Sequence, residues 1–301
     1  MGFLFDTFKG WEEAVKKQNC AVWEPVLAYE EEQKGNDAIS VRTGLRETLR
    51  VMFEAVETGL NDDMKSRSGM INNGAKKVYN HPVSVLGPEF QKLISRALAA
   101  KEVNSCMGRV VAAPTAGASG IIPGVLYTLK EQHDLSEEIL EEGLLIAAGI
   151  GLIIETKAGV AGAVGGCQAE TGSAAAMASG AIVYALGGDF HAIGNAVGIT
   201  IQCMLGLVCD PVAGLVEVPC VVRNASAAAI AFSSAQIALS GMSGVIPVDE
   251  CIDAMAEVGE SMEDRYKETA LGGLAATKTG QAISKKVLIS DIEIIDEESE
   301  D

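Results

Sequence analysis

The stretch "GSAAAMASGAIVYAL", residues 172–186, consists almost entirely of small and aliphatic side chains. A second run of the same kind, "NASAAAIAFSSAQIALSGM", occupies residues 224–242. Both runs are rich in Ala, the best helix former, and poor in clustered β-branched residues, so each is predicted to be a helix. Small side chains let helix backbones approach closely, which accounts for most glycines between Gly143 and Gly244. We therefore predict an all-α fold built around an Ala/Gly-rich helical domain.

Segments outside this centre also favour helices. Apolar residues recur at steps of three and four between Val41 and Leu60, which predicts one amphipathic helix. The polar stretch "NDDMKSRSGMINNGAKK", residues 61–77, has no apolar period and is predicted to be a loop, and the helical pattern returns from Pro88 to Met107. The apolar run from Gly143 to Ile154 is too short to span a bilayer, so we predict a buried core helix there.

These patterns divide the chain into three parts. Residues 1–65 form an N-terminal helical lead-in, residues 66–290 a helical domain that carries the candidate site, and residues 291–301 an acidic tail. The tail ends in "IIDEESED" and is expected to be frayed and solvated.

Composition and charge restrict the class of protein. The 301 residues are 48% hydrophobic, which excludes global disorder. The net charge of −18 argues against binding to nucleic acid or to an anionic membrane surface. The N-terminal "MGFLFDTFKGWEEAVKKQNC" carries charges where a signal peptide would be apolar. We expect a soluble, cytoplasmic protein.

Three of the seven cysteines have a distinctive setting. Cys167 follows two glycines in "VGGCQAETGSAA", Cys209 precedes Asp-Pro, and Cys220 follows Pro219. Such neighbours produce loops and helix ends, from which a thiolate can reach a metal. The other four lie in helix-like runs and are interpreted as small apolar core residues: Cys20, Cys106, Cys203 and Cys251.

Three thiolates suit either zinc or an iron–sulfur cluster. A structural zinc site calls for a fourth Cys or His at short spacing, and the sequence has none. A cluster with three protein ligands leaves one iron open, and an open iron is a Lewis acid. Spacing alone leaves both alternatives open, together with the interpretation that the thiols are merely buried.

Four ordered motifs carry a resemblance to a known family: "GRVVAAPTAGASGIIPGVL", "GGCQAETGSAAAMA", "GLVCDPVAGLVEVPCVVRNA" and "ETALGGLAATKTG". From about Arg42 to about Gly280 the chain resembles the α subunit of the iron–sulfur-dependent L-serine dehydratases (L-serine ammonia-lyases). The resemblance implies that Cys167, Cys209 and Cys220 hold a 4Fe–4S cluster in cluster-binding loops. It implies deamination of L-serine to pyruvate and ammonia, with the open iron as Lewis acid for the leaving hydroxyl and without pyridoxal phosphate.

The resemblance also implies a partner. The family has a β part, a separate chain or an N-terminal domain, with a Ser- and His-containing stretch that nothing in this sequence matches. The three histidines, His81, His133 and His191, fall in no family motif; we expect His133 to be solvated and His191 to start a helix. We therefore predict a hetero-oligomer in which the β subunit supplies the general base.

Two polar loops match family segments and are candidate contacts for a small amino-acid substrate. The candidates are Ser66, Ser68, Asn72 and Asn73 in "SRSGMINNG", and Thr115, Gly117 and Ser119 in "PTAGASG". Amides of such a Gly-rich turn can bind a substrate carboxylate. The competing interpretation is that both are ordinary loops.

Some positions depart from the family pattern. Lys157 stands where Asn is usual, Asn72-Asn73-Gly74 replaces Gly-Gly-Asp, and Lys278 stands where Pro is common. These departures affect the expected substrate contacts and leave the cysteines intact. Three alternatives therefore stay open: a lyase acting on L-threonine or L-cysteine, a non-catalytic iron–sulfur sensor, and a helical structural partner with buried cysteines.

Overall fold

The computed structural model describes residues 5–298, except for the side chains of Lys34 and of residues 290–298. Within that range the secondary structure is helical, and extended pairing is limited to two isolated bridges, Lys65–Asn72 and Cys209–Lys267. This confirms the predicted all-α fold. The α-helices are α1 (Phe8–Gln18), α2 (Glu24–Lys34), α3 (Ala38–Asn61), α4 (Gly74–Tyr79), α5 (Pro88–Ser105), α6 (Ile121–His133), α7 (Glu137–Ala158), α8 (Gly162–Gly165), α9 (Ser173–Ala185), α10 (Phe190–Met204), α11 (Cys220–Leu239), α12 (Val248–Ser261) and α13 (Lys278–Glu298).

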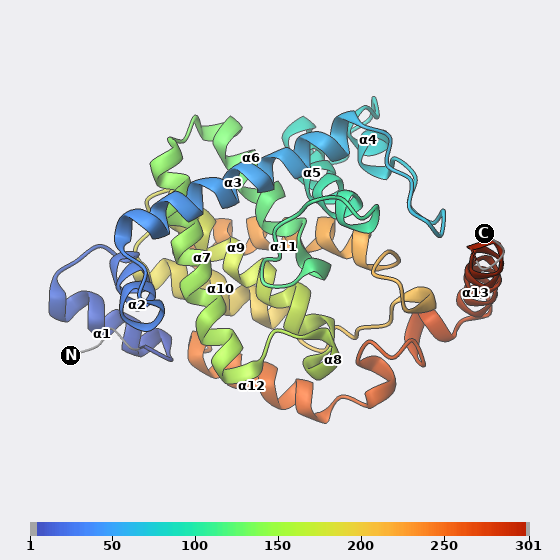
Figure 1. Ribbon diagram of the computed structural model, residues 1–301. Helices are drawn as coiled ribbons and strands as arrows, with labels where there is room; N and C mark the ends of the chain where they lie inside the picture. Colours follow the sequence, from blue (N-terminus) through green and yellow to red (C-terminus); the bar gives the residue numbers. More distant parts are fainter. Residues whose placement is uncertain (1–4, 299–301) are drawn as a thin grey trace.

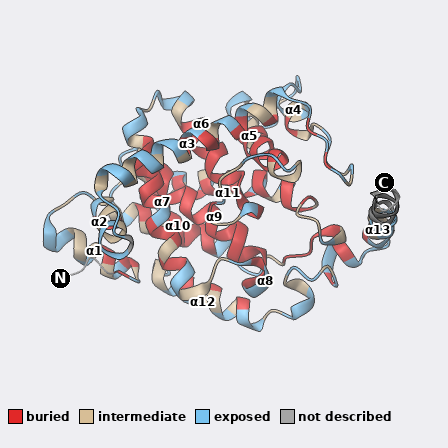
Figure 2. Ribbon diagram, viewed as in Figure 1, coloured by how far each residue is buried: buried red, intermediate tan, exposed pale blue. Residues whose placement is uncertain are grey.

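Helix α9, the first of the two Ala-rich runs, lies at the centre of the molecule (Figure 1). It packs against α6, α7, α10 and α11, and all of its residues from Ser173 to Val183 are buried. Figure 2 shows the same central helices as the most deeply buried part of the chain. The apolar run between Gly143 and Ile154 lies within α7, as predicted. None of the described helices is both long enough and apolar enough to cross a membrane.

Helix α3 confirms the period seen between Val41 and Leu60. It begins after Asp37, whose carboxylate accepts the Ser40 amide at 2.9 Å and so caps the helix. Near its other end Gly59 contacts the backbone of α5, and a Cβ at Gly59 would stand 2.3 Å from the Ala99 carbonyl oxygen. The close contact of α3 with α5 therefore depends on a residue without a side chain at position 59.

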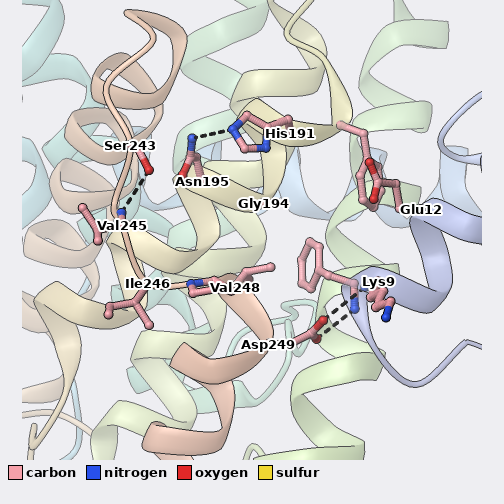
Figure 3. Close-up of a pocket in the computed structure, with 13 residues that line it drawn as sticks. Lys9, Glu12, His191, Gly194, Asn195, Ser243, Val245, Ile246, Val248 and Asp249 are labelled. Carbon is pink, nitrogen blue, oxygen red and sulfur yellow. Dashed lines mark hydrogen bonds between the residues drawn. The ribbon is translucent and has the colours of Figure 1, made fainter.

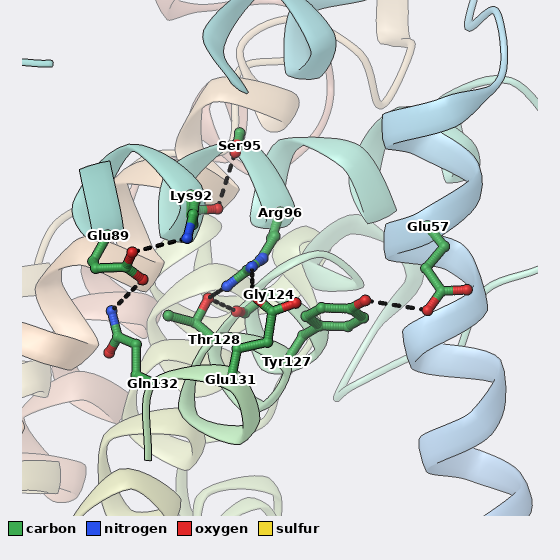
Figure 4. Close-up of polar contacts among 10 residues, drawn as sticks. All are labelled: Glu57, Glu89, Lys92, Ser95, Arg96, Gly124, Tyr127, Thr128, Glu131 and Gln132. Atoms are coloured by element: carbon green, nitrogen blue, oxygen red, sulfur yellow. Dashed lines mark hydrogen bonds and ion pairs between the residues drawn. The ribbon is translucent and has the colours of Figure 1, made fainter. Parts of the chain in front are cut away.

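A buried arginine joins α5 to α6 (Figure 4). The Arg96 guanidinium donates to Thr128 Oγ1 at 3.1 Å, pairs with Glu131, and lies 5.0 Å from the centre of the Tyr127 ring. Tyr127 in turn donates to Glu57 on α3 at 3.2 Å. These contacts fix α5, the helix that carries Lys101 into the candidate site.

The loop predicted over residues 61–77 ends in a short helix, α4, which the sequence pattern missed. The start of α4 is stabilised from a distant helix, because Glu102 of α5 accepts the backbone amides of Gly74 at 2.8 Å and Ala75 at 3.2 Å. A cap supplied by tertiary structure leaves no local signal.

The interpretation of four cysteines as core residues is correct for Cys251 and wrong for Cys203, which is exposed on α10. Cys20 and Cys106 are half-buried, since they lie just beyond the ends of α1 and α5, where the chain reaches the surface.

At the C-terminus α13 projects from the body and packs against the short turns Val212–Gly214 and Gly273–Ala276 (Figure 1). It runs through residue 291, where the predicted acidic tail begins, and residues 299–301 of that tail lie outside the described part. The three-part division of the chain stays a prediction.

Candidate active site

The two candidate substrate loops meet at one cavity of about 480 Å³. The serine loop contributes Ser68 and the Gly-rich turn contributes Gly117. The segment between Cys209 and Cys220 supplies Glu217, and α5 supplies Asn104 and Ser105. Segments that are far apart in sequence thus surround one space, which Arg67 of the serine loop also lines.

Glu217 organises the serine loop. Its carboxylate accepts hydrogen bonds from the hydroxyls of Ser66, at 2.6 Å, and Ser68. The Ser66 hydroxyl also accepts the Ile71 amide at 3.1 Å, which closes the loop on itself. Glu217 and Ser66 are both buried. The serine hydroxyls therefore donate their hydrogen bonds to an acidic side chain and not to a molecule in the cavity.

The Gly-rich turn is held by Asn224 of α11. The Asn224 amide oxygen accepts the Gly120 amide at 2.9 Å, and its NH₂ group donates to the carbonyls of Gly117 at 2.8 Å and Cys220 at 2.9 Å. Asn224 is fully buried. One side chain thus fixes the turn to the first residue of α11, which is Cys220.

Glu170 lies against the same turn. Its carboxylate accepts the Thr115 hydroxyl, and a Cβ at Gly117 would stand 2.3 Å from Glu170 Oε1. The turn therefore needs glycine at position 117 to make room for the carboxylate. Burial raises the pKa of Glu170, and the nearby Lys101 charge acts in the opposite direction.

The three predicted ligand cysteines are buried, free thiols that come from three segments. Cys167 precedes a π-helical turn, Gln168–Gly172, Cys209 lies in a loop, and Cys220 begins α11. Burial is the main cause that raises the thiol pKa at all three positions, to about 12 for Cys220. The nearby charges of Cys167 and Cys220 also raise the pKa of Cys209, and the charge of Glu170 raises the pKa of all three thiols. The fold thus brings the cysteines and Glu170 into one electrostatic neighbourhood.

The loop between Cys209 and Cys220 is tied down at several points. Its backbone closes through a bond from the Val212 amide to the Val218 carbonyl at 2.8 Å. Asp210 pairs with Arg223 of α11 at 2.8 Å and accepts the Leu274 amide at 2.7 Å. The late motif "ETALGGLAATKTG" therefore packs directly onto the cysteine loop.

The arrangement of thiols can be compared with what a metal centre requires. Among the described residues, no three His, Cys, Asp or Glu side chains are arranged to hold a single metal ion. An iron–sulfur cluster places each thiolate on a separate iron, so its ligands need not converge on one point. Gly162 leaves open the space beside Cys209, since a Cβ there would stand 3.2 Å from the sulfur. Three buried thiols that form no disulfide, with such a space beside one of them, fit the donor set of a cluster.

Lys101 is a third charged group of the site, after Glu217 and Glu170, that the sequence did not reveal. Its side chain is fully buried, and burial lowers the pKa of its ammonium to about 8. Within the described residues its acceptors are uncharged: Asn104 Oδ1, and the Ala116 carbonyl at 3.5 Å. The carboxylates of Glu170 and Glu217 act on it through their charge.

The other predicted substrate contacts have structural surroundings. Asn73 immediately precedes α4 in a left-handed conformation, and its side-chain oxygen accepts the Met64 amide at 2.7 Å. Asn72 is exposed, and its carbonyl accepts Lys77 Nζ at 2.7 Å. Ser119 is fully buried inside the turn, and its hydroxyl has no partner among the described residues. None of these three lines the cavity described above.

The histidines lie away from this cavity and are exposed. His133 is the last residue of α6 and His191 the second residue of α10, so both expectations for them are met. His191 lines a different pocket, between α1, α10 and the start of α12, where Asp249 accepts the amides of Phe8 and Lys9 (Figure 3).

The two lysines that depart from the family pattern also have defined places. Lys157 pairs with Asp253 of α12 at 2.8 Å. Lys278 is exposed at the start of α13. Neither lines the cavity.

Sequence reasoning missed four residues of the site: Lys101, Glu170, Glu217 and Asn224. A faint signal existed for Glu170 and Glu217, because each is an isolated acid within a motif that is otherwise small or apolar. For Lys101 and Asn224 the contacts span α5, the turn and α11, and no local pattern reports them.

Fold and site together define an all-α protein with three buried thiols, one of which, Cys220, is linked through Asn224 to the turn that lines a cavity. A sequence profile of the family described as serine dehydratase alpha chain matches residues 17–275. The chain therefore belongs to the serine dehydratase alpha chain family.

Individual relatives agree over most of the chain. It is 40% identical over 287 residues to the probable L-serine dehydratase alpha chain of Bacillus subtilis, covering 94% of this chain and 95% of the relative. It is 43% identical to the L-serine dehydratase alpha chain of Peptoniphilus asaccharolyticus, covering 87% and 91%. It is 40% identical to the L-serine dehydratase of Streptomyces coelicolor, where the match covers 83% of this chain and 56% of the relative.

Proposed function

We propose that this chain is the cluster-binding alpha chain of an L-serine dehydratase, a lyase that converts L-serine to pyruvate and ammonia. The observation that carries the proposal is the convergence of the serine loop, the Gly-rich turn and the cysteine loop on one cavity. Family membership and the names of the relatives support the same reaction.

We further propose that Cys167, Cys209 and Cys220 hold a 4Fe–4S cluster. When bound, such a cluster supplies a Lewis-acidic iron that stabilises a departing hydroxyl. The chain's own residues bind and orient the substrate. Asn224 holds the turn beside the cavity, where the backbone amides of the turn can meet a carboxylate.

The general base is proposed to come from a β partner. The described histidines do not line the cavity, and a base must come within hydrogen-bond reach of the α-proton. Two relatives are named alpha chains, and the Streptomyces coelicolor enzyme is longer than the region matched here. Both observations agree with a second polypeptide part that completes the site.

Two measurements test these proposals. Iron and acid-labile sulfide per chain, measured after anaerobic purification, should fall when Cys167, Cys209 or Cys220 is changed to Ala. The same content should persist in the matched variants Cys203→Ala and Cys251→Ala. Loss of the cluster in Cys203→Ala with retention in Cys209→Ala would contradict the ligand set.

The second measurement is pyruvate release from L-serine with and without the β-type chain. The reconstituted chain alone should turn over slowly, and the partner should raise the rate by orders of magnitude. Full activity of the chain alone would return the search for a base to its own residues. Preference for L-threonine or L-cysteine would correct the substrate, and a cluster without any turnover would favour a sensor.

A further inference from the structure

The hydrogen bonds of the serine loop fix a carboxylate at the cavity. Ser66 and Ser68 both donate to the Glu217 carboxylate, and Glu217 lines the cavity together with Ser68 and Arg67. The Glu217 carboxylate attracts a cation, whereas the Arg67 guanidinium attracts an anion. The two serine hydroxyls are committed to Glu217 and are therefore unsuited to bind the substrate carboxylate.

Glu217 is held rigidly at this position. Its amide donates to the Leu215 carbonyl at 2.7 Å, and its carbonyl accepts the Val221 amide at 2.9 Å at the start of α11. The preceding carbonyl, of Val216, accepts the Ser105 hydroxyl at 3.2 Å. Glu217 is buried and also lines the cavity. A buried carboxylate that is fixed at a cavity wall can form an ion pair with an ammonium group without having to move.

A positive group, Lys101, lies behind another wall of the cavity. Lys101 lies one turn before Asn104 and Ser105 on α5, and residues spaced three and four apart share a helix face. Asn104 and Ala116, the two acceptors of Lys101 Nζ, both line the cavity. Lys101 therefore lies beside the Gly-rich turn, on the side where a carboxylate is expected.

We propose that Glu217 binds the α-ammonium group of the substrate, that Ser66 and Ser68 position it, and that Lys101 with the Gly-rich turn binds the α-carboxylate. The cavity then selects α-amino acids by reading both charges of the zwitterion. This inference rests on the proposed function and adds residues that distinguish one end of the substrate from the other.

Three unreactive ligands separate the two charges. L-alanine carries both groups, propanoate lacks the ammonium, and ethylamine lacks the carboxylate. Their competitive inhibition constants against L-serine are measured on the anaerobic holoenzyme with its partner chain. Glu217→Gln should weaken L-alanine about 10- to 100-fold, the range for a hydrogen bond to a charged group, and leave propanoate unchanged or tighter. Lys101→Met should weaken propanoate and leave ethylamine unchanged.

Controls separate binding from folding. Glu142→Gln removes a buried carboxylate that accepts the Tyr184 hydroxyl at 2.7 Å on α7, outside the cavity, and should alter none of the constants. If Glu217→Gln fails to bind the cluster or shows no thermal unfolding transition, Ser68→Ala is the second variant, because it keeps the Glu217 charge and removes one hydrogen-bond donor to it. Ser68→Ala should weaken L-alanine by a smaller factor than the one expected for Glu217→Gln, and it should leave propanoate binding unchanged.

Equal weakening of L-alanine and propanoate by Glu217→Gln, weakening of ethylamine by Lys101→Met, or no effect of Glu217→Gln, would overturn the inference. Failure of the proposed function looks different: the wild-type holoenzyme would release no pyruvate from L-serine. In that case equilibrium dialysis with L-alanine and propanoate tests the charge assignment without turnover.

Discussion

Replacing Asn224 by Ala should destabilise the turn that connects the substrate cavity to Cys220. The change removes three hydrogen bonds and leaves two buried backbone groups, the Gly120 amide and the Gly117 carbonyl, without a partner. The third, the Cys220 carbonyl, lies within α11 and keeps a helical acceptor role. An unsatisfied buried group costs about 1–3 kcal/mol, so the expected loss is about 2–6 kcal/mol in the free energy of unfolding.

A domain is normally stable by about 5–15 kcal/mol, so this loss is a large share of the total. Urea unfolding under anaerobic conditions, followed by circular dichroism, measures it directly. Asn224→Asp keeps the acceptor for Gly120 and loses both donors, so its stability should lie between wild type and Asn224→Ala. Asn195→Ala is the matched control, because its bonds are long, at 3.4 Å. A loss below about 1 kcal/mol for Asn224→Ala would refute the reasoning.

Three further outcomes are expected. Air should inactivate the enzyme, because an iron without a protein thiolate is open to oxidants, and anaerobic ferrous iron with a thiol should restore pyruvate release. Gly117→Ala should lower activity and cost about 1–3 kcal/mol in urea unfolding, because the new Cβ displaces the Glu170 carboxylate from Thr115. Burial raises the pKa of Glu102 above 4.5, so folding binds its proton more tightly and the free energy of unfolding falls as pH rises from 4.5 through the folded pKa. Glu102→Gln should remove that part of the pH dependence, as urea unfolding at several pH values can establish.

Each of these outcomes can be contradicted. Activity that survives prolonged aeration would point away from an open iron. A Gly117→Ala variant with wild-type activity would mean that the contact with Glu170 is unimportant for the site. Identical pH slopes for wild type and Glu102→Gln would show that the Glu102 pKa does not change on folding.

The helical fold was accessible from sequence because its signals are local. Ala-rich composition predicts α9 and α11, and the three- and four-residue period predicts α3. Helix α4 was not accessible, since Glu102 caps it from another helix. Local periodicity also gave the wrong environment for Cys203, because a residue in a helical run can face solvent as easily as the core.

The site was only partly accessible for the same reason. Motifs indicated Ser68 and Gly117 as candidate substrate contacts, which stays a prediction, and the structure shows that both line the cavity. Glu217 and Lys101 entered only once the structure gave their partners, since a buried charge is recognised by what surrounds it rather than by its neighbours in sequence. The cysteines as cluster ligands stay a prediction that chemistry must test.

The most direct test of the account is pyruvate release from L-serine by the anaerobic holoenzyme, compared between wild type and Cys209→Ala with the partner chain present in both. The account predicts steady turnover by the wild type and loss of that turnover, together with bound iron and sulfide, in Cys209→Ala. Equal rates in the two proteins, or no pyruvate from the iron- and sulfide-loaded wild type, would contradict it.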